Sequence, residues 1–111
     1  MATETIKSAS YLLPAANTLS TLYTVPSSTQ AVISTINVCN TASADATYRI
    51  AVVPNGVSIT NANYIVYNAI VAGNETISFT QGITMDAQDT LRVFTSTASV
   101  AFNAFKMEIT A

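Results

Sequence analysis

Two aspartates form the closest pair of acidic side chains in the sequence. Asp86 and Asp89 lie in the segment MDAQD. General acid–base catalysis needs two carboxyl groups in one pocket with separated pKa values, and a turn is a poor place for such a pocket. We expect both side chains to cap a turn by accepting hydrogen bonds from local backbone N–H groups. A Ca²⁺ site is the alternative, although a hard cation takes six or more oxygen ligands and this segment offers few.

The single cysteine is the next candidate for chemistry. Cys39 lies in the apolar run AVISTINVCN, and the sequence contains no histidine. A catalytic thiol needs a nearby base, and a zinc site needs four Cys or His ligands, so neither is expected. With no second cysteine, an internal disulfide is excluded. We expect Cys39 to act as a small buried apolar side chain.

Serine and glycine motifs of enzymes are also missing. No G-x-S-x-G segment occurs, and without histidine the usual catalytic triad cannot form. Gly56, Gly73 and Gly82 are too far apart to build a phosphate-binding loop. The glycosylation sequon at Asn74 is a weak three-residue match without a secretory signal. The sequence therefore predicts a protein that is not an enzyme and has no catalytic residues, metal site or cofactor.

The composition points to contact with other proteins. Only 9% of residues are charged and the net charge is −2, whereas Thr, Ser and Asn number 17, 11 and 9. The four basic residues, Lys7, Arg49, Arg92 and Lys106, are scattered, so no basic stripe is available for nucleic acid or anionic lipid. A lone soluble protein usually keeps a charged surface to resist association. A weakly charged surface suits a protein whose faces are covered by neighbours.

The start of the chain shows no export signal. MATETIKSAS is polar and no apolar h-region follows it. No stretch approaches the ~20 apolar residues of a membrane-spanning helix. We expect that the protein is made in a cytoplasm and does not associate with membranes.

Short alternating segments predict the elements of the fold. Runs rich in Val, Ile, Thr, Tyr and Phe are separated by polar turns, and no helical period is present. The predicted fold is all-β: a single antiparallel β-sandwich, jelly-roll-like, with about seven or eight strands. Residues 1–17 are predicted to form an N-terminal arm or edge strand, and residues 18–111 the sandwich domain. Strands are expected at residues 3–13, 18–25, 31–39, 46–53, 64–71, 76–80, 90–96 and 100–110.

Some of these strands carry more detailed expectations. In residues 31–39, Val32, Ile36 and Val38 are assigned to one face. Residues 64–71 are apolar on both parities, so both faces are expected to be covered. Residues 72–74 are expected to close a hairpin. In the last strand the apolar parity changes, which predicts a bulge near residues 103–104.

Four residues are candidates for an interface. Tyr64 and Tyr67 are expected on opposite faces of one strand, so that one of them is exposed, and tyrosine suits interfaces because its ring is apolar and its hydroxyl bonds. Ile6 and Tyr11 lie on the N-terminal arm. The arm is expected to reach a neighbour by strand addition, which uses main-chain hydrogen bonds.

A sequence pattern adds a family resemblance. The segment TLYTVPSSTQAVISTINVCNTASADATYRIAV resembles small virion proteins of tailed bacteriophages, in which LYTVP leads through a polar turn to an apolar strand. A short CNT turn then precedes a second strand that ends in RIAV. The later segment YIVYNAIVAGNETISFTQGITMDAQDTLRVF looks like its continuation, with a hairpin at AGNET and a corner at GITMDAQDTLRV. The resemblance covers residues 19–109 and implies a β-sandwich that decorates or completes a virion.

The resemblance and the composition together predict a function. We expect a non-enzymatic virion structural protein, a capsid decoration (cement) protein that stabilises a phage head by bridging coat subunits. Its expected partners are the major capsid protein or other virion proteins and further copies of itself, as a homotrimer. It would reside in the virion after synthesis in the host cytoplasm. The alternative is a tail, neck or host-receptor-binding component, with VSITNANY and TSTAS as candidate glycan-binding loops.

Overall fold

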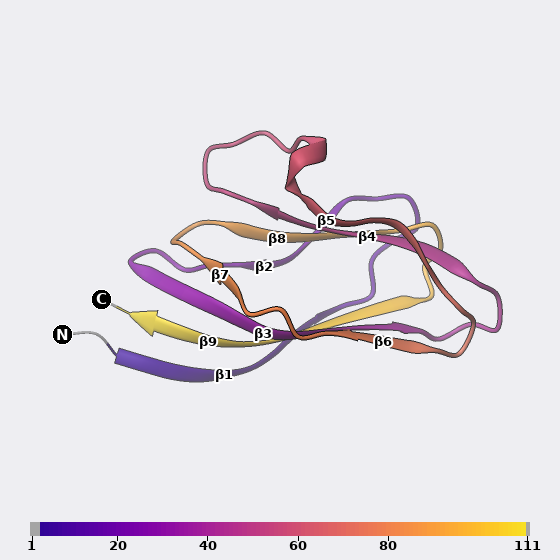
Figure 1. Ribbon diagram of the computed structural model, residues 1–111, viewed down its shortest axis with the longest axis horizontal. Helices are drawn as coiled ribbons and strands as arrows, with labels where there is room; N and C mark the ends of the chain where they lie inside the picture. The colour runs from indigo at the N-terminus through magenta and orange to yellow at the C-terminus, as the bar shows by residue number, and fades with distance from the viewer. Residues whose placement is uncertain (1–2, 111) are drawn as a thin grey trace.

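Nine β-strands make up the computed structural model, which describes the backbone of residues 3–110 and the side chains of residues 10–110 (Figure 1). They are β1 (Thr3–Leu12), β2 (Ser20–Thr24), β3 (Thr29–Asn40), β4 (Ala46–Val53), β5 (Tyr64–Val71), β6 (Thr76–Phe79), β7 (Ile83–Met85), β8 (Thr90–Thr95) and β9 (Val100–Thr110). A short 3₁₀ turn, η1 (Asn61–Asn63), precedes β5. The strand beyond the predicted eight is β7, which lies in a segment expected to be a corner.

The strands form two antiparallel sheets packed face to face (Figure 1). The first sheet has the order β1-β9-β3-β6, with β7 also paired to β3, and the second has the order β2-β8-β4-β5. The predicted all-β antiparallel sandwich is therefore confirmed, and the strand order is that of a two-sheet jelly roll. Because β1 contacts β2 and β5 contacts β3, strands β1 and β2 form one lateral edge of the sandwich, and β5 and β6 form the other.

The core lies between the two sheets. Leu91 and Val93 of β8 point inward and are fully buried, as their alternation with polar residues predicts. The Tyr48 ring of β4 contacts the rings of Phe79 and Phe102, each with a centroid distance of 6.4 Å. Tilted aromatic pairs contribute about 0.5–1.5 kcal/mol beyond the area they bury. Since these rings come from both sheets, they hold the sheets in one relative position.

A change of facing occurs in β3, where the alternation alone does not predict it. Ala31 and Ile33 are buried before the change, and Ile36 and Val38 are buried after it. Ser34 is the extra residue of a bulge, because its neighbours on either side pair with two consecutive residues of β9. The prediction that Val32 shares one face with Ile36 and Val38 is wrong, because the bulge reverses the parity between them.

The last strand keeps one parity throughout. Even-numbered residues of β9 from Val100 to Glu108 are buried, while Phe105 is 42% exposed. The predicted bulge near residues 103–104 is therefore wrong. That prediction assumed that apolar side chains mark the inner face, whereas Lys106 and Glu108 occupy inner positions here. The irregularities lie in the strands that flank β9, which is itself regular.

Strand β5 is an edge strand with two irregularities. Its pairing with β4 shifts between Tyr48 and Ile50 and again between Ile50 and Ala51, and Asn68 has a φ of 52°. A single bulge reverses the parity of the residues beyond it. The extra residue between Tyr64 and Val66 is the bulge that separates the two tyrosines, so Tyr64 and Tyr67 share one face, with ring centroids 5.0 Å apart. This contradicts the prediction that they lie on opposite faces.

Two turns depend on glycines, and one of them connects the two sheets where a hairpin was expected. Gly56 adopts a φ of +79° in the turn after β4, where Val57 N donates to the Pro54 carbonyl oxygen at 3.2 Å. At Gly73 the reason is close packing, because a Cβ there would lie 2.0 Å from the carbonyl oxygen of Ser43. The predicted hairpin at residues 72–74 is wrong, since this turn carries the chain from β5 in the second sheet to β6 in the first.

The N-terminal segment pairs within the chain. β1 lies antiparallel to β9 at the edge of the first sheet, so the backbone of residues 3–12 forms an edge strand. The Ile6 side chain lies outside the described residues, and the boundary between residues 17 and 18 stays a prediction. Within the described part of the chain, no helix has the length and apolar character needed to cross a membrane.

Candidate functional site

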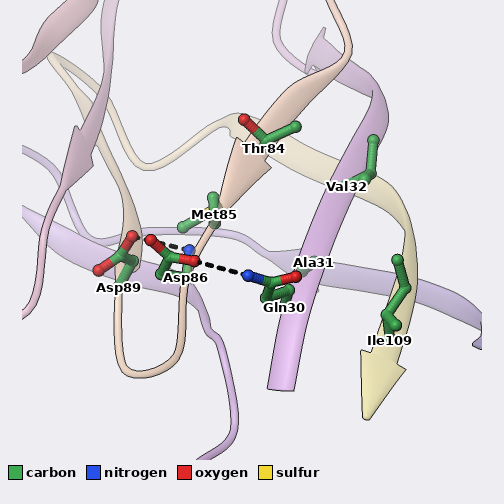
Figure 2. Close-up of a pocket in the computed structure, with 8 residues that line it drawn as sticks. All are labelled: Gln30, Ala31, Val32, Thr84, Met85, Asp86, Asp89 and Ile109. Atoms are coloured by element: carbon green, nitrogen blue, oxygen red, sulfur yellow. Dashed lines mark hydrogen bonds between the residues drawn. The ribbon is translucent and has the colours of Figure 1, made fainter. Parts of the chain in front are cut away.

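The first candidate is a hollow beside the aspartate pair, with a volume of about 380 Å³ (Figure 2). Asp86 Oδ1 accepts a hydrogen bond from Gln30 Nε2 at 3.1 Å. Asp89 uses both oxygens on backbone groups: Oδ2 accepts from Asp86 N at 2.9 Å and Oδ1 accepts from Asn55 N at 2.8 Å. The predicted turn-capping role is confirmed for Asp89.

The chemistry of this hollow is limited by its lining. It is lined by Gln30, Ala31, Val32, Thr84, Met85, Asp86, Asp89 and Ile109. General acid–base work requires a partner whose pKa is set apart from that of the first carboxyl, and Asp89 is already committed to two backbone N–H donors. Across the described residues, no group of three or more His, Cys, Asp or Glu side chains is placed to hold a metal ion. The hollow therefore has the features of a surface depression around a capped turn.

Cys39 differs from its prediction in burial. Its thiol is free, and the side chain is partly exposed on the outer face of the first sheet, because Val38 and Asn40 take the inner positions. The sequence run around it is apolar, but the bulge at Ser34 decides which residues face the core. The described structure gives this thiol no catalytic partner.

The strongest candidate surface lies on the outer face of the second sheet. We call it the Arg49 patch, and it consists of Arg49, Tyr64, Tyr67, Ile70 and Phe94. The Arg49 guanidinium lies between the rings of Tyr67 and Phe94, 4.3 Å from each centroid. Phe94 is opposite Arg49 in the β4–β8 pairing, and Ile70 is opposite Thr47, two residues away on the same face. Three adjacent strands therefore present one continuous surface.

The Arg49 patch combines exposed apolar area with an oriented cation. Tyr67 is 53% exposed and Ile70 is 65% exposed, so the expectation that both faces of β5 are covered is wrong within the single chain. Arg49 Nε donates to Asn68 Oδ1 at 2.6 Å, and within the described residues the Arg49 side chain makes no other hydrogen bond. Its terminal nitrogens therefore keep their N–H donors, held in one plane by the two rings.

Sequence reasoning found only part of this surface. Tyr64 and Tyr67 were candidates, but Arg49, Ile70 and Phe94 were not. The available signal is alternation, since Arg49 lies between Tyr48 and Ile50, and Phe94 follows Val93. Their meeting depends on the pairing of β4 with β8, which the sequence alone does not specify. The irregular pairing of β5 with β4, in which Tyr67 lies beside Arg49, is likewise invisible in the alternation.

A second exposed apolar surface lies on the outer face of the first sheet, at its β1 edge. We call Tyr11 and Leu13 the Tyr11 patch; they are 79% and 56% exposed. Tyr11 belongs to the end of β1, opposite Asn103 of β9, and Leu13 begins the connection to β2. That connection is anchored, because Asn17 N donates to the Thr95 carbonyl oxygen at 2.7 Å. The predicted candidate Tyr11 is thus at the surface.

A buried polar cluster stabilises this β1 edge. Lys106 and Glu108 are 9% and 8% exposed, and charged side chains at that depth are normally paired. Tyr23 donates its hydroxyl to Glu108 Oε2, and Lys106 Nζ lies 4.7 Å from the Tyr23 ring centroid and donates to Ser10 Oγ at 2.8 Å. Burial, followed by the hydrogen bond to Glu108, raises the pKa of Tyr23 above its usual value. The cluster ties β1, β2 and β9 together.

Comparisons with known proteins add the fold but no family. No family model matches the chain, and no curated protein matches it. A chain from Bacillus endospore appendages, described as disulfide-linked pili, has a TM-score of 0.52 and 22% identity over 97% of this chain and 85% of that one. A pentameric capsid protein from metagenomic phage sequences has a TM-score of 0.47 and 18% identity over 89% of this chain and 59% of that one. The first comparison shows that this chain and the appendage chain share a fold.

Proposed function

We propose that this chain is a non-enzymatic structural subunit of a virion, and that it decorates the capsid by bridging coat subunits. The observation that carries the proposal is the Arg49 patch. Tyr and Arg are enriched where proteins bind one another, because they combine large contact area with directed hydrogen bonds. A half-buried arginine stacked between two rings, beside an exposed isoleucine, has the composition of an interface centre.

Two further features support a structural role. The sequence resembles small virion proteins of tailed phages from residue 19 to residue 109, and the fold is shared with a chain that belongs to an assembled appendage. A subunit that binds only the assembled shell stabilises that shell by mass action, and this requires surfaces rather than catalytic groups. Partners in the proposal are coat subunits and further copies of the chain; a homotrimer remains the oligomer predicted from the sequence.

Labelling of purified particles tests the proposal. An antibody against the chain, carrying gold, should decorate heads in a regular pattern under the electron microscope. Label found only on tails would refute capsid decoration and support a tail or receptor-binding component. Particles purified after replacement of Arg49 by Ala should carry less label, whereas replacement of exposed Val57 by Ala, outside the patch, should leave the label unchanged.

A further inference from the structure

Both exposed apolar patches lie at the same height on opposite sides of the sandwich. Leu12, beside the Tyr11 patch, pairs with Phe102, which in turn pairs with Val38 of β3. Two residues further along β3, Asn40 donates from Nδ2 to the carbonyl oxygen of Val71, the residue after Ile70. The two patches are therefore at nearly the same level along the strands. They lie near opposite lateral edges and on the outer faces of different sheets, because Tyr11 pairs with Asn103 at an outward position of β9 and Ile70 lies on the edge strand β5 of the second sheet. A neighbouring copy must therefore overlap this one to bring the two patches together.

The chemistry of the two patches is complementary. The Arg49 patch offers N–H donors on the terminal nitrogens of Arg49, surrounded by ring and aliphatic surface. The Tyr11 patch offers the opposite: the Tyr11 hydroxyl oxygen, which can accept a hydrogen bond, beside the exposed Leu13 side chain. The guanidinium donors meet this acceptor, and apolar side chains meet apolar side chains, when a neighbouring copy is shifted sideways so that the two patches overlap. Two Arg49 patches facing each other would instead bring two guanidinium groups together.

We propose that copies of this chain associate side by side through unlike surfaces, with the Arg49 patch of one copy against the Tyr11 patch of the next. Such a contact leaves one free patch of each kind on every pair, so it continues into a closed ring or an open row. Equal heights of the two patches keep successive copies level. The inference rests on the assembly role proposed above, but it does not depend on which particle the chain decorates.

A glycan is the competing occupant of the Arg49 patch. Sugar rings stack on the open faces of aromatic side chains, but here a face of Tyr67 and a face of Phe94 are covered by the Arg49 guanidinium. The edge-to-face contact with Tyr64 further restricts the Tyr67 ring. The isoleucine on the same surface gains from contact with an apolar protein side chain. These features favour a second copy of the chain.

Two lysine substitutions and their mixture test the proposal on the purified full chain. Ile70→Lys damages only the Arg49 patch, and Leu13→Lys damages only the Tyr11 patch. Both side chains are more than half exposed, so each variant should keep the fold, which circular dichroism and thermal unfolding verify. Val57→Lys is the matched control, because Val57 is 47% exposed in the loop beyond the far end of β4.

Sedimentation velocity at rising protein concentration gives the readout. We expect wild type and Val57→Lys to grow beyond dimers, and each patch variant alone to associate at least about tenfold more weakly, the loss expected at the centre of an interface. An equimolar mixture of Ile70→Lys and Leu13→Lys should form a 1:1 dimer and stop there, because each variant supplies the surface that the other lacks.

Any of four results would overturn the proposal. Self-association of Leu13→Lys as strong as that of wild type would indicate a contact between like surfaces. A mixture that stays monomeric would also refute contact between unlike patches, and so would loss of association in Val57→Lys. A wild-type chain that stays monomeric but binds a glycan array through Arg49 would assign the patch to a sugar. In each case gold labelling of heads tests the virion role separately.

Discussion

Asn40 is a buried junction at the end of the sandwich that carries the two patches. Its side chain is 1% exposed and makes four hydrogen bonds. Nδ2 donates to the carbonyl oxygens of Ala44 at 2.8 Å and Val71 at 3.2 Å, and Oδ1 accepts from Ala42 N and Ser99 Oγ, both at 3.1 Å. Replacement by Ala removes all four bonds at once and leaves their partners without the amide.

The loss of unfolding free energy depends on whether water can reach each of the four hydrogen-bond partners. Val71 is fully buried, so its carbonyl oxygen loses this amide donor where water does not reach, at about 2 kcal/mol. The other three groups are on partly or fully exposed residues and recover water, at about 0.5 kcal/mol each. We expect Asn40→Ala to lose about 3.5 kcal/mol of unfolding free energy. With an unfolding entropy of about 2.1 cal/mol/K per residue, this lowers Tm by about 15 °C.

Urea and thermal unfolding of the two proteins measure this loss. The matched control is Thr41→Val, which removes the single bond from Thr41 Oγ1 to the Ser99 carbonyl oxygen at 2.7 Å, on an exposed side chain. It should cost less than about 1 kcal/mol, because an exposed group regains water. An Asn40→Ala protein within about 0.5 kcal/mol of wild type, less than one net hydrogen bond, would refute the reasoning.

Three further changes have definite expected outcomes. Gly73→Ala brings a Cβ to 2.0 Å from the Ser43 carbonyl oxygen, so backbone must move, and chemical unfolding should show a loss of about 3 kcal/mol; a loss below about 1 would contradict the packing. The raised pKa of Tyr23 means that its contribution to stability is complete below about pH 10 and is lost as the pH rises further. Tyr23→Phe should therefore flatten the decline of unfolding free energy above about pH 10. If the unfolding free energies of wild type and Tyr23→Phe fall in parallel with pH, the Glu108 contact is contradicted. Arg49→Lys loses the plane stacked between two rings, so self-association should weaken while Tm changes by only a few degrees; an unchanged sedimentation profile would speak against the stacked guanidinium as a contact.

Strand positions could be predicted because alternation has a local cause. Side chains of a strand alternate between faces, so apolar residues such as Leu91 and Val93 mark the inner face wherever the strand is regular. Both β5 and β9 begin and end at the residues predicted from the sequence. The all-β class and the capping role of Asp89 follow from similarly local signals.

Which residues of the long strands β3 and β9 point to the core could not be predicted, because this depends on how these strands pair and pack with other strands. The bulge at Ser34 is seen only when β3 is paired with β9. In β9 the inner positions of Lys106 and Glu108 depend on Tyr23 of β2, which is far away in sequence. A rule that assigns charged side chains to solvent fails wherever partners from other strands satisfy the charge.

The Arg49 patch could likewise be predicted only in part. Tyr64 and Tyr67 attract notice by residue type, yet their shared face is created by irregular pairing in β5. Arg49 gains its role from Phe94 and Tyr67, which come from two other strands. Sequence therefore suggested an interface on β5 but not the arrangement that makes it specific.

Cryo-electron microscopy of the purified parent particle shows directly whether the chain decorates the head. We expect copies of this sandwich at repeated positions on the head, with the Arg49 patch covered by protein and the hollow beside Asp86 open to solvent. A reconstruction in which the chain is missing from the head, or in which Tyr67 and Ile70 face solvent in every copy, would contradict this expectation.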